Sequence, residues 1–305
     1  MTEVQNDTTI QVTRQPRFGN DLIFVSQIHA QNNRKGPDQT MQNTGHTDTV
    51  SFLNCPDGTK RAYLHHEGRA GVPGLVFLAG HGSDMFGTKA EMLHQLAVDA
   101  DIPFLRFDYF GHGLSDGAFL DGTISKWVDD CVLMLDQLTS GPQLLVGSSL
   151  GGWLMIRTAQ KRPERVAGLV GIAAAPDFTE TLIWDALTAP QKQQMQTTGH
   201  IALPNPYAPE DVIYPYHLVT DGRDNLVLDK PVGLSLPVIL LQGMADHEVP
   251  WQTAIKIAEQ WQSGDVQVIL DKAAGHRFSE DSQIEQICSV VRRLHDRISA
   301  EPQTA

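Results

Sequence analysis

Short apolar runs alternate with amphipathic, helix-like segments along most of this 305-residue chain. The runs are continuously apolar, which is typical of strands buried on both faces of a sheet. Strands of this kind, joined by helices, predict an α/β fold with a mostly parallel, doubly wound sheet. The predicted strands are 50–54, 61–65, 74–78, 103–107, 143–146, 166–172, 237–241 and 266–270. The predicted helices are 89–100, 124–138, 150–161, 251–261 and 281–298. The first two strands flank Pro56-Asp57-Gly58, a turn sequence that predicts a hairpin.

Two segments depart from this alternation. Residues 1–48 include 12 hydrophobic residues, or 25 %, against 41 % for the chain. We expect a disordered N-terminal tail there, because so little apolar surface cannot offset the entropy of ordering. A start of translation at Met41 is a further hypothesis. We expect one α/β domain over 49–305, and within it residues about 177–236 carry several prolines and scattered apolar side chains. A structureless loop of that length is improbable, so we expect a small cap inserted after the sixth strand.

Charge and cysteine content narrow the classes of function. The formal net charge is −13, which disfavours binding to nucleic acid or to an anionic lipid surface. No apolar run approaches the roughly 18 residues that a membrane span needs, so we expect no stable membrane insertion. Three cysteines without a CxxC pair argue against a disulfide framework and favour a reducing compartment. We predict the cytoplasm, with the mitochondrial matrix as the alternative.

The strongest chemical signal is the sequence Gly147-Ser148-Ser149-Leu150-Gly151-Gly152, which follows an apolar strand and opens a helix. A nucleophile elbow requires this context, with small residues two before and two after the serine. Gly147 and Gly151 satisfy that spacing for Ser149, whereas Ser148 is out of register. Ser149 is therefore the predicted nucleophile.

A serine nucleophile needs a base and an acid that orients the base, and in this architecture both follow late strands. Asp246 follows the strand 237–241, and His276 follows the strand 266–270. Their order after Ser149 predicts a Ser-Asp-His triad. Glu248, two residues beyond Asp246, is the less favoured alternative for the acid.

An oxyanion hole requires two backbone N–H groups. The residue after the nucleophile, Leu150, supplies the first, and the loop after the strand 74–78 supplies the second. His81 is the first choice in that loop and Gly82 the second, with the His81 side chain as an alternative substrate contact. The glycine-rich stretches lack dinucleotide and P-loop spacing, and no cluster has metal-ligand spacing, so we predict neither cofactor nor metal.

Apolar side chains in the predicted cap either line an acyl pocket or pack the cap onto the sheet, and the sequence leaves both open. The tentative substrate-binding residues are Trp184, Leu187, Leu203 and Tyr214. In the loop 108–116, Asp108 and Ser115 are predicted to be structural hydrogen-bond partners.

With these residues, the chain resembles the α/β-hydrolase superfamily. Residues 77–90, 106–109, 141–155 and 249–252 are similar to one subgroup, the mitochondrial palmitoyl-protein thioesterases, also called mycophenolic acid acyl-glucuronide esterases. The resemblance spans about residues 50–295. It implies a serine hydrolase of acyl thioesters and activated acyl esters, with Ser149, Asp246 and His276 as the triad.

The sequence therefore predicts a hydrolase that forms an acyl-enzyme on a small-molecule or acylated-protein (thio)ester. A carboxylesterase or acyl-glucuronide esterase acting on small substrates is the alternative, because pocket shape rather than the triad selects the bond. A non-catalytic binding protein on the same fold is the remote alternative. Dehalogenases and epoxide hydrolases are excluded, since they need a carboxylate at the position of Ser149.

Overall fold

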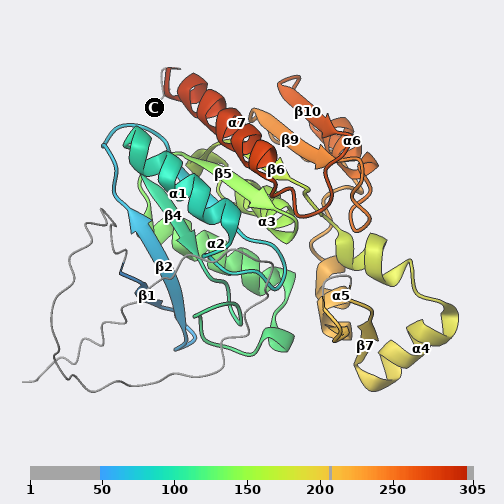
Figure 1. The fold of residues 1–305 in the computed structure, drawn as a ribbon. Coiled ribbons are helices and arrows are strands. Elements are labelled where there is room, and N and C mark those ends of the chain that lie inside the picture. The colour runs from blue at the N-terminus through green and yellow to red at the C-terminus, as the bar shows by residue number, and fades with distance from the viewer. Residues whose placement is uncertain (1–48, 206–207, 301–305) are drawn as a thin grey trace, which may run out of the picture. The chain divides into compact units, whose positions relative to one another are not determined.

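A mixed eight-stranded sheet forms the centre of the domain (Figure 1). The computed structural model describes residues 49–205 and 208–300, so the expectations for residues 1–48 lie outside the described residues. The strands run in the order β1-β2-β4-β3-β5-β6-β9-β10. Their bounds are β1 (Ser51–Asn54), β2 (Lys60–His66), β3 (Gly74–Leu78), β4 (Phe104–Phe107), β5 (Gln143–Ser148), β6 (Val166–Ile172), β9 (Val238–Gly243) and β10 (Val266–Asp271).

The pairing confirms the predicted sheet. β1 and β2 form the antiparallel hairpin, and β2 pairs antiparallel with β4. All other pairs from β4 to β10 are parallel. Every position of β3, β5 and β9 is buried, which explains why these strands read as unbroken apolar runs. Because parallel strands end at one edge, the loops that follow β3, β5, β9 and β10 lie together there.

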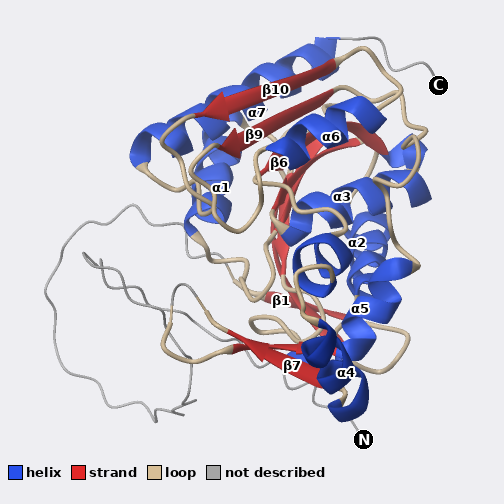
Figure 2. Ribbon diagram, turned by 90° about the vertical axis from the view of Figure 1, so that its right-hand side faces the viewer, coloured by secondary structure: helices blue, strands red, loops and turns tan. Residues whose placement is uncertain are grey.

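Helices cover both faces of the sheet (Figure 2). They are α1 (Thr88–Ala100), α2 (Ile124–Leu138), α3 (Leu150–Lys161), α6 (Gln252–Gln260) and α7 (Asp281–Ala300). α1 packs with α7 on one face, and α2 packs with α3 on the other. Each bound lies within two residues of its prediction. None of the helices in the described ranges has the length and hydropathy to span a bilayer.

The segment between β6 and β9 is folded. It contains a π-helix η3 (Thr179–Trp184), α4 (Ala189–Thr198), the antiparallel strands β7 (His200–Leu203) and β8 (Val212–Pro215), and α5 (Tyr216–Arg223). We call residues 177–236 the cap. Leu187, Met195, Ile201 and Val219 form a small buried cluster of their own. The carboxylate of Asp177 accepts hydrogen bonds from the N–H groups of Val227 and Leu228, both 2.9 Å, which joins the beginning of the cap to its end.

A buried ion pair fixes the loop that follows β4. Arg61 on β2 donates from Nε to Asp130 Oδ1 on α2 at 2.7 Å, and both residues are less than 5 % exposed. Asp130 Oδ2 accepts the N–H of Phe110 at 2.7 Å. Burial raises the pKa of Asp130 to about 6, although Arg61 and the Phe110 N–H favour its ionised form. The pair therefore connects the hairpin, α2 and the loop 108–116.

Replacing Arg61 with Met should lower the free energy of unfolding by about 3–5 kcal/mol, because Asp130 would remain buried without its counter-charge. Urea denaturation measures this change. Arg292→Met is the control, since Arg292 pairs with Asp296 on the exposed surface of α7, where such pairs contribute about 0.5 kcal/mol or less. A loss below about 1 kcal/mol for Arg61→Met would contradict the interpretation.

Candidate active site

The backbone makes a strained turn at Ser149, between β5 and α3. Ser149 has φ 53° and ψ −115°, a region that non-glycine residues rarely occupy. Its N–H donates to the carbonyl of Ile172 at 3.0 Å, and its own carbonyl accepts the N–H of Ala175 at 3.1 Å. A Cβ on Gly147 would overlap the backbone of Gly151 and Gly152, and a Cβ on Gly151 would overlap the backbone at the end of β3. The two glycines thus permit the turn that presents the Ser149 side chain at the sheet edge.

The structure brings three predicted residues into one hydrogen-bonded chain. His276 Nε2 lies 3.0 Å from Ser149 Oγ, and His276 Nδ1 lies 2.8 Å from Asp246 Oδ2. A carboxylate only accepts hydrogen bonds, so Nδ1 carries the ring proton and donates a hydrogen bond to Asp246. Nε2 then holds a lone pair that accepts the hydroxyl proton of Ser149. This arrangement meets the geometric requirement for a serine activated by an oriented base.

Asp246 is buried in a set of donors. Gln242 Nε2 donates to Oδ2 at 3.0 Å, and the N–H groups of Glu248 and Val249 donate to Oδ1 at 2.9 and 2.8 Å. Burial opposes ionisation, but the hydrogen bond and electrostatic attraction of His276, together with these N–H groups, outweigh burial and hold the pKa of Asp246 below its usual value. The alternative acid, Glu248, contributes its backbone to this set.

The loop after β3 lies against the nucleophile. A Cβ built on Gly80 would be 3.4 Å from Ser149 Cβ. Leu150 is the first residue of α3, where an N–H has no partner within the helix. The N–H of Gly82 donates to His112 Nε2 at 3.2 Å, so the second-choice oxyanion donor is already engaged. His81 remains the candidate for the second donor.

The His81 ring lies at the centre of an aromatic cluster that reaches into the cap. Its centroid lies 4.8 Å from the ring of Phe119, in the 3-10 helix η1 (Phe119–Asp121), and 5.9 Å from the ring of Phe178. It also stacks on Tyr214 of β8, with a centroid separation of 5.7 Å and an angle of 19°. Burial, with a smaller effect from His112, lowers the pKa of His81 to about 3, so the ring is neutral.

The four tentative cap residues separate into two groups. Trp184 and Leu187 pack with the cap's own buried cluster, and the Trp184 ring lies under the cations of Lys192 and Arg223. Leu203 and Tyr214 contact both this cluster and the main core. The structure therefore brings Tyr214 to the His81 loop, while the contacts of Trp184 and Leu187 lie within the cap.

The loop 108–116 contains the structural hydrogen bonds expected of Asp108 and Ser115. Asp108 accepts the N–H groups of Met85 and Leu114, both at 2.8 Å. Ser115 Oγ donates to the Asp108 carbonyl at 2.6 Å. Burial raises the pKa of Asp108 to about 7, against the effect of its two backbone donors. These bonds fix the loop beside the candidate site.

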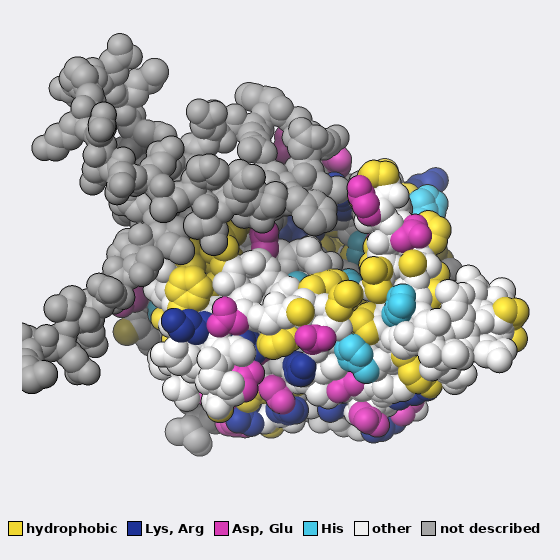
Figure 3. All heavy atoms as spheres, turned by 90° about the horizontal axis from the view of Figure 1, so that it is seen from below, with side chains coloured by type: hydrophobic (Ala, Val, Ile, Leu, Met, Phe, Trp, Pro, Cys, Tyr) yellow, Lys and Arg dark blue, Asp and Glu magenta, His cyan; other side chains and the backbone are white. Residues whose placement is uncertain are grey.

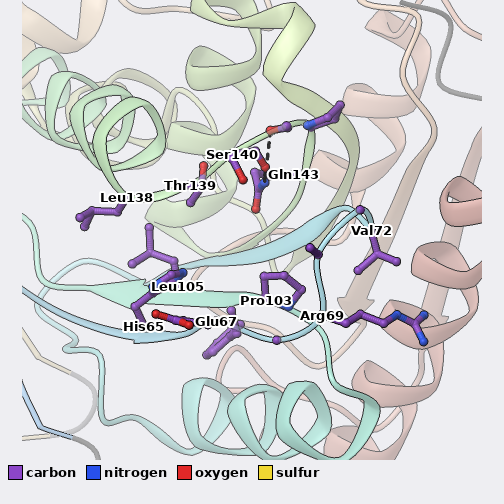
Figure 4. A pocket seen from close by; sticks show the side chains of 16 residues that line it. His65, Glu67, Arg69, Val72, Pro103, Leu105, Leu138, Thr139, Ser140 and Gln143 are labelled. Atoms are coloured by element: carbon purple, nitrogen blue, oxygen red, sulfur yellow. Dashed lines mark hydrogen bonds between the residues drawn. The ribbon is translucent and has the colours of Figure 1, made fainter.

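A cavity of about 440 Å³ lies at the opposite edge of the sheet (Figure 4). It is lined by residues that precede or begin β3, β4 and β5, including Arg69, Pro103 and Gln143. None of the predicted site residues lines it, so this cavity is separate from Ser149.

Neither the metal-ligating groups of the described residues nor the charges on the face shown in Figure 3 mark a further site. Across 49–205 and 208–300, no group of three or more His, Cys, Asp or Glu side chains could hold a metal ion. On the face in Figure 3, Lys and Arg are interspersed with Asp and Glu, and hydrophobic and His side chains gather between them.

Two contributors to the site were missed by sequence reasoning. Gln242 holds Asp246, and His112 holds Gly82. Gln242 carries a detectable signal, because it is a polar residue within a buried strand and such groups are hydrogen-bonded. His112 was visible as part of the loop 108–116, but its partner lies 30 residues away and could not be predicted.

Comparisons with known proteins identify the family to which the chain is similar. A family model described as serine aminopeptidase, S33, matches residues 73–212. Mitochondrial palmitoyl-protein thioesterase ABHD10 of Bos taurus is 36 % identical over 276 residues, which cover 90 % of this chain and 89 % of the relative. The Homo sapiens protein of that name is 37 % identical over 252 residues, covering 82 % and 81 %. The solved structure of α/β hydrolase domain-containing protein 10 from mouse has a TM-score of 0.76 and 36 % identity, covering 82 % of this chain and 99 % of that one.

The close packing at the elbow predicts the effect of one added methyl group. Gly151→Ala should lower the free energy of unfolding by about 1–3 kcal/mol or more, since its Cβ would overlap the carbonyl oxygen of Leu78. Thermal unfolding measures the effect. Gly264→Ala is the matched control, because a Cβ there meets nothing within 4 Å. Equal melting temperatures for the two variants would contradict the packing argument.

Proposed function

Because the chain belongs to the ABHD10 family of α/β hydrolases and is a hydrolase, we propose that it cleaves acyl thioesters or activated acyl esters. In this proposal Ser149, His276 and Asp246 are the catalytic residues. The observation that carries it is the position of His276, with one ring nitrogen on Ser149 Oγ and the other on Asp246. Because these relatives are named as thioesterases, we set aside the alternative that the chain is a non-catalytic binding protein.

The proposed reaction proceeds in two steps. Ser149 Oγ attacks the acyl carbonyl carbon while His276 Nε2 takes the hydroxyl proton. The carbonyl oxygen becomes an oxyanion, which the N–H groups of Leu150 and His81 stabilise. When the tetrahedral intermediate collapses, the thiol or alcohol leaves with the proton from His276, and the acyl group remains on Ser149. Water, deprotonated by His276, then attacks this ester and releases the acid.

Relatives suggest the substrate class. The ABHD10 proteins of Bos taurus and Homo sapiens carry the name palmitoyl-protein thioesterase, so an acylated protein is the proposed substrate here. A carboxylesterase or acyl-glucuronide esterase on small substrates is the alternative, since the same three residues serve both reactions. The name of these relatives also includes a mitochondrial location, which favours the mitochondrial matrix over the cytoplasm as the proposed compartment.

The acyl group is proposed to lie against the cap. Tyr214 is the best supported of the tentative substrate-binding residues, because its ring stacks on His81 beside the nucleophile. Leu203 lies in the strand that pairs with β8 and also contacts the main core. Trp184 and Leu187 remain proposed substrate-binding residues. Substituting either one would affect the substrate through the packing of the cap's own buried cluster.

Hydrolysis of a matched acyl thioester and oxygen ester at several chain lengths tests the proposed reaction. Ser149→Ala should lower kcat by at least about 10,000-fold on both substrates, because no other group supplies the nucleophile. Faster turnover of long-chain thioesters by the unmodified protein would support the depalmitoylating function. Faster turnover of short esters or acyl glucuronides would favour the alternative, and activity that survives Ser149→Ala would refute the mechanism.

The two candidate acids can be separated by amide substitutions. Asp246→Asn should lower kcat by about 1,000- to 10,000-fold, since an amide no longer holds the imidazole in the required tautomer. Glu248→Gln should lower it by less than about tenfold, because Glu248 supports Asp246 through its backbone N–H. The reverse ranking of kcat would assign the acid to Glu248.

Tyr214→Ala tests the acyl contact. We expect kcat/KM to fall by about 10- to 100-fold for long acyl chains and by much less for acetyl esters, because an acetyl group offers little apolar surface for the proposed contact with Tyr214. Trp184→Ala is the matched variant. We expect it to lower the stability of the cap and to leave the ratio of long-chain to short-chain turnover unchanged, because Trp184 packs within the cap. If both variants keep the wild-type ratio, Tyr214 does not contact the acyl group.

A further inference from the structure

His112 is a buried histidine that the proposed reaction does not use. It is 3 % exposed, and its ring packs edge-on against Tyr109, Phe119 and Trp127. Nε2 lies 3.2 Å from the Gly82 nitrogen, and Nδ1 lies 3.1 Å from the Phe110 carbonyl oxygen. Burial lowers the pKa of His112 to about 4, so the ring is neutral at neutral pH.

These two contacts define the tautomer. A backbone N–H can only donate, so Nε2 of His112 accepts the proton of Gly82. The single ring proton therefore lies on Nδ1, which donates to the carbonyl of Phe110. Each ring nitrogen has one partner of the right kind, and the ring connects the loop after β4 to the loop after β3.

The hydrogen bond from Gly82 to His112 lies in a turn whose conformation affects the proposed oxyanion donor. Ser83 N–H donates to the Gly80 carbonyl at 3.1 Å, which closes a four-residue turn. Gly82, the third residue, has φ +70°, which is typical of a type II turn. A type I turn would need a negative φ there and would rotate the peptide between His81 and Gly82. Because His112 holds the N–H of that peptide, it favours the type II form.

The peptide before it carries the proposed oxyanion donor. The His81 N–H and the Gly80 carbonyl belong to one peptide group, and Ser83 holds that carbonyl. Two other side chains tether the ends of the oxyanion loop, defined as residues 79–85. Tyr109 Oη donates to the Ala79 carbonyl at 3.1 Å, and Asp108 accepts the Met85 N–H at 2.8 Å. His112 supplies the tether at the turn itself.

We propose that His112 is a positioning residue: its neutral ring accepts the Gly82 N–H and so keeps the His81 N–H directed at the carbonyl oxygen that Ser149 attacks. This inference rests on the proposed function, in which His81 is an oxyanion donor. Loss of the acceptor frees the turn to change type. It slows the steps that build negative charge on the substrate oxygen and leaves ground-state binding in place.

Two substitutions separate this role from packing. His112→Phe keeps an aromatic ring but removes the acceptor, whereas His112→Gln keeps an oxygen that can accept the Gly82 N–H. We expect His112→Phe to lower kcat by about 10- to 100-fold with KM within about threefold, which is less than the loss of an oxyanion donor outright. His112→Gln should restore kcat to within about fivefold of the wild type. A trifluoromethyl ketone that matches the acyl group should bind His112→Phe more weakly, by the factor that kcat/KM has lost.

A second readout does not depend on the substrate. The rate of reaction of Ser149 with a fluorophosphonate should fall in His112→Phe and recover in His112→Gln, because the phosphoryl oxygen occupies the same oxyanion site. His200→Phe is the control, since His200 is exposed on the cap. Active-site titration and the melting temperature correct each rate for misfolded protein.

Three outcomes would overturn the proposal. The first is that His112→Phe hydrolyses substrate and reacts with the fluorophosphonate at wild-type rates, and the second is that His112→Phe and His112→Gln are impaired equally. The third is that His112→Phe melts at a lower temperature but keeps the wild-type ketone affinity and phosphonylation rate. If the wild type hydrolyses neither thioesters nor esters while phosphonylation still distinguishes the variants, the proposed function fails and the role of His112 stands.

Discussion

The left-handed backbone at Ser149 is the constraint on which the rest of the site depends. It turns the chain from β5 into α3 so sharply that side chains on Gly147 and Gly151 would overlap neighbouring backbone. A residue in such a conformation costs about 1–3 kcal/mol and persists only when its surroundings fix it. Here the N–H of Ser149 is bound to β6, and its carbonyl is bound by Gly152 and Ala175. The strained turn thus rests on the parallel sheet, and the serine hydroxyl is presented toward His276.

Sequence reasoning located the elements that follow local rules. The strands and helices follow periodicity and burial, and the hairpin follows its turn residues. The mutual approach of Ser149, Asp246 and His276 follows from topology, because parallel strands bring their carboxyl ends to one edge. The oxyanion loop was placed by the same argument. Its catalytic role, like that of the triad, stays a prediction until the variants are measured.

The sequence could not supply contacts between side chains that are distant in the chain. His112 and Gly82 are 30 residues apart, and Tyr214 reaches His81 from a strand within the cap. Nothing periodic marks either pair, because each depends on how two irregular segments pack. The same limit explains Trp184, whose apolar character suits an acyl contact and a cap core equally well. Buried polar groups such as Gln242 are the exception, since burial itself requires that they have partners.

Asp177 forms a junction that bears on how inserts at this position of the sheet can change in size and sequence. Its backbone is left-handed at φ 60°, and its carboxylate receives the chain as it returns at Val227 and Leu228. These two hydrogen bonds hold the start of the cap beside residues 227–228. The entropy of closing a loop grows only slowly with its length, by about 0.6 kcal/mol for each doubling. An insert of different size or sequence could therefore be exchanged at this junction at little cost in loop-closure entropy, and contacts such as that of Tyr214 with His81 would change with it.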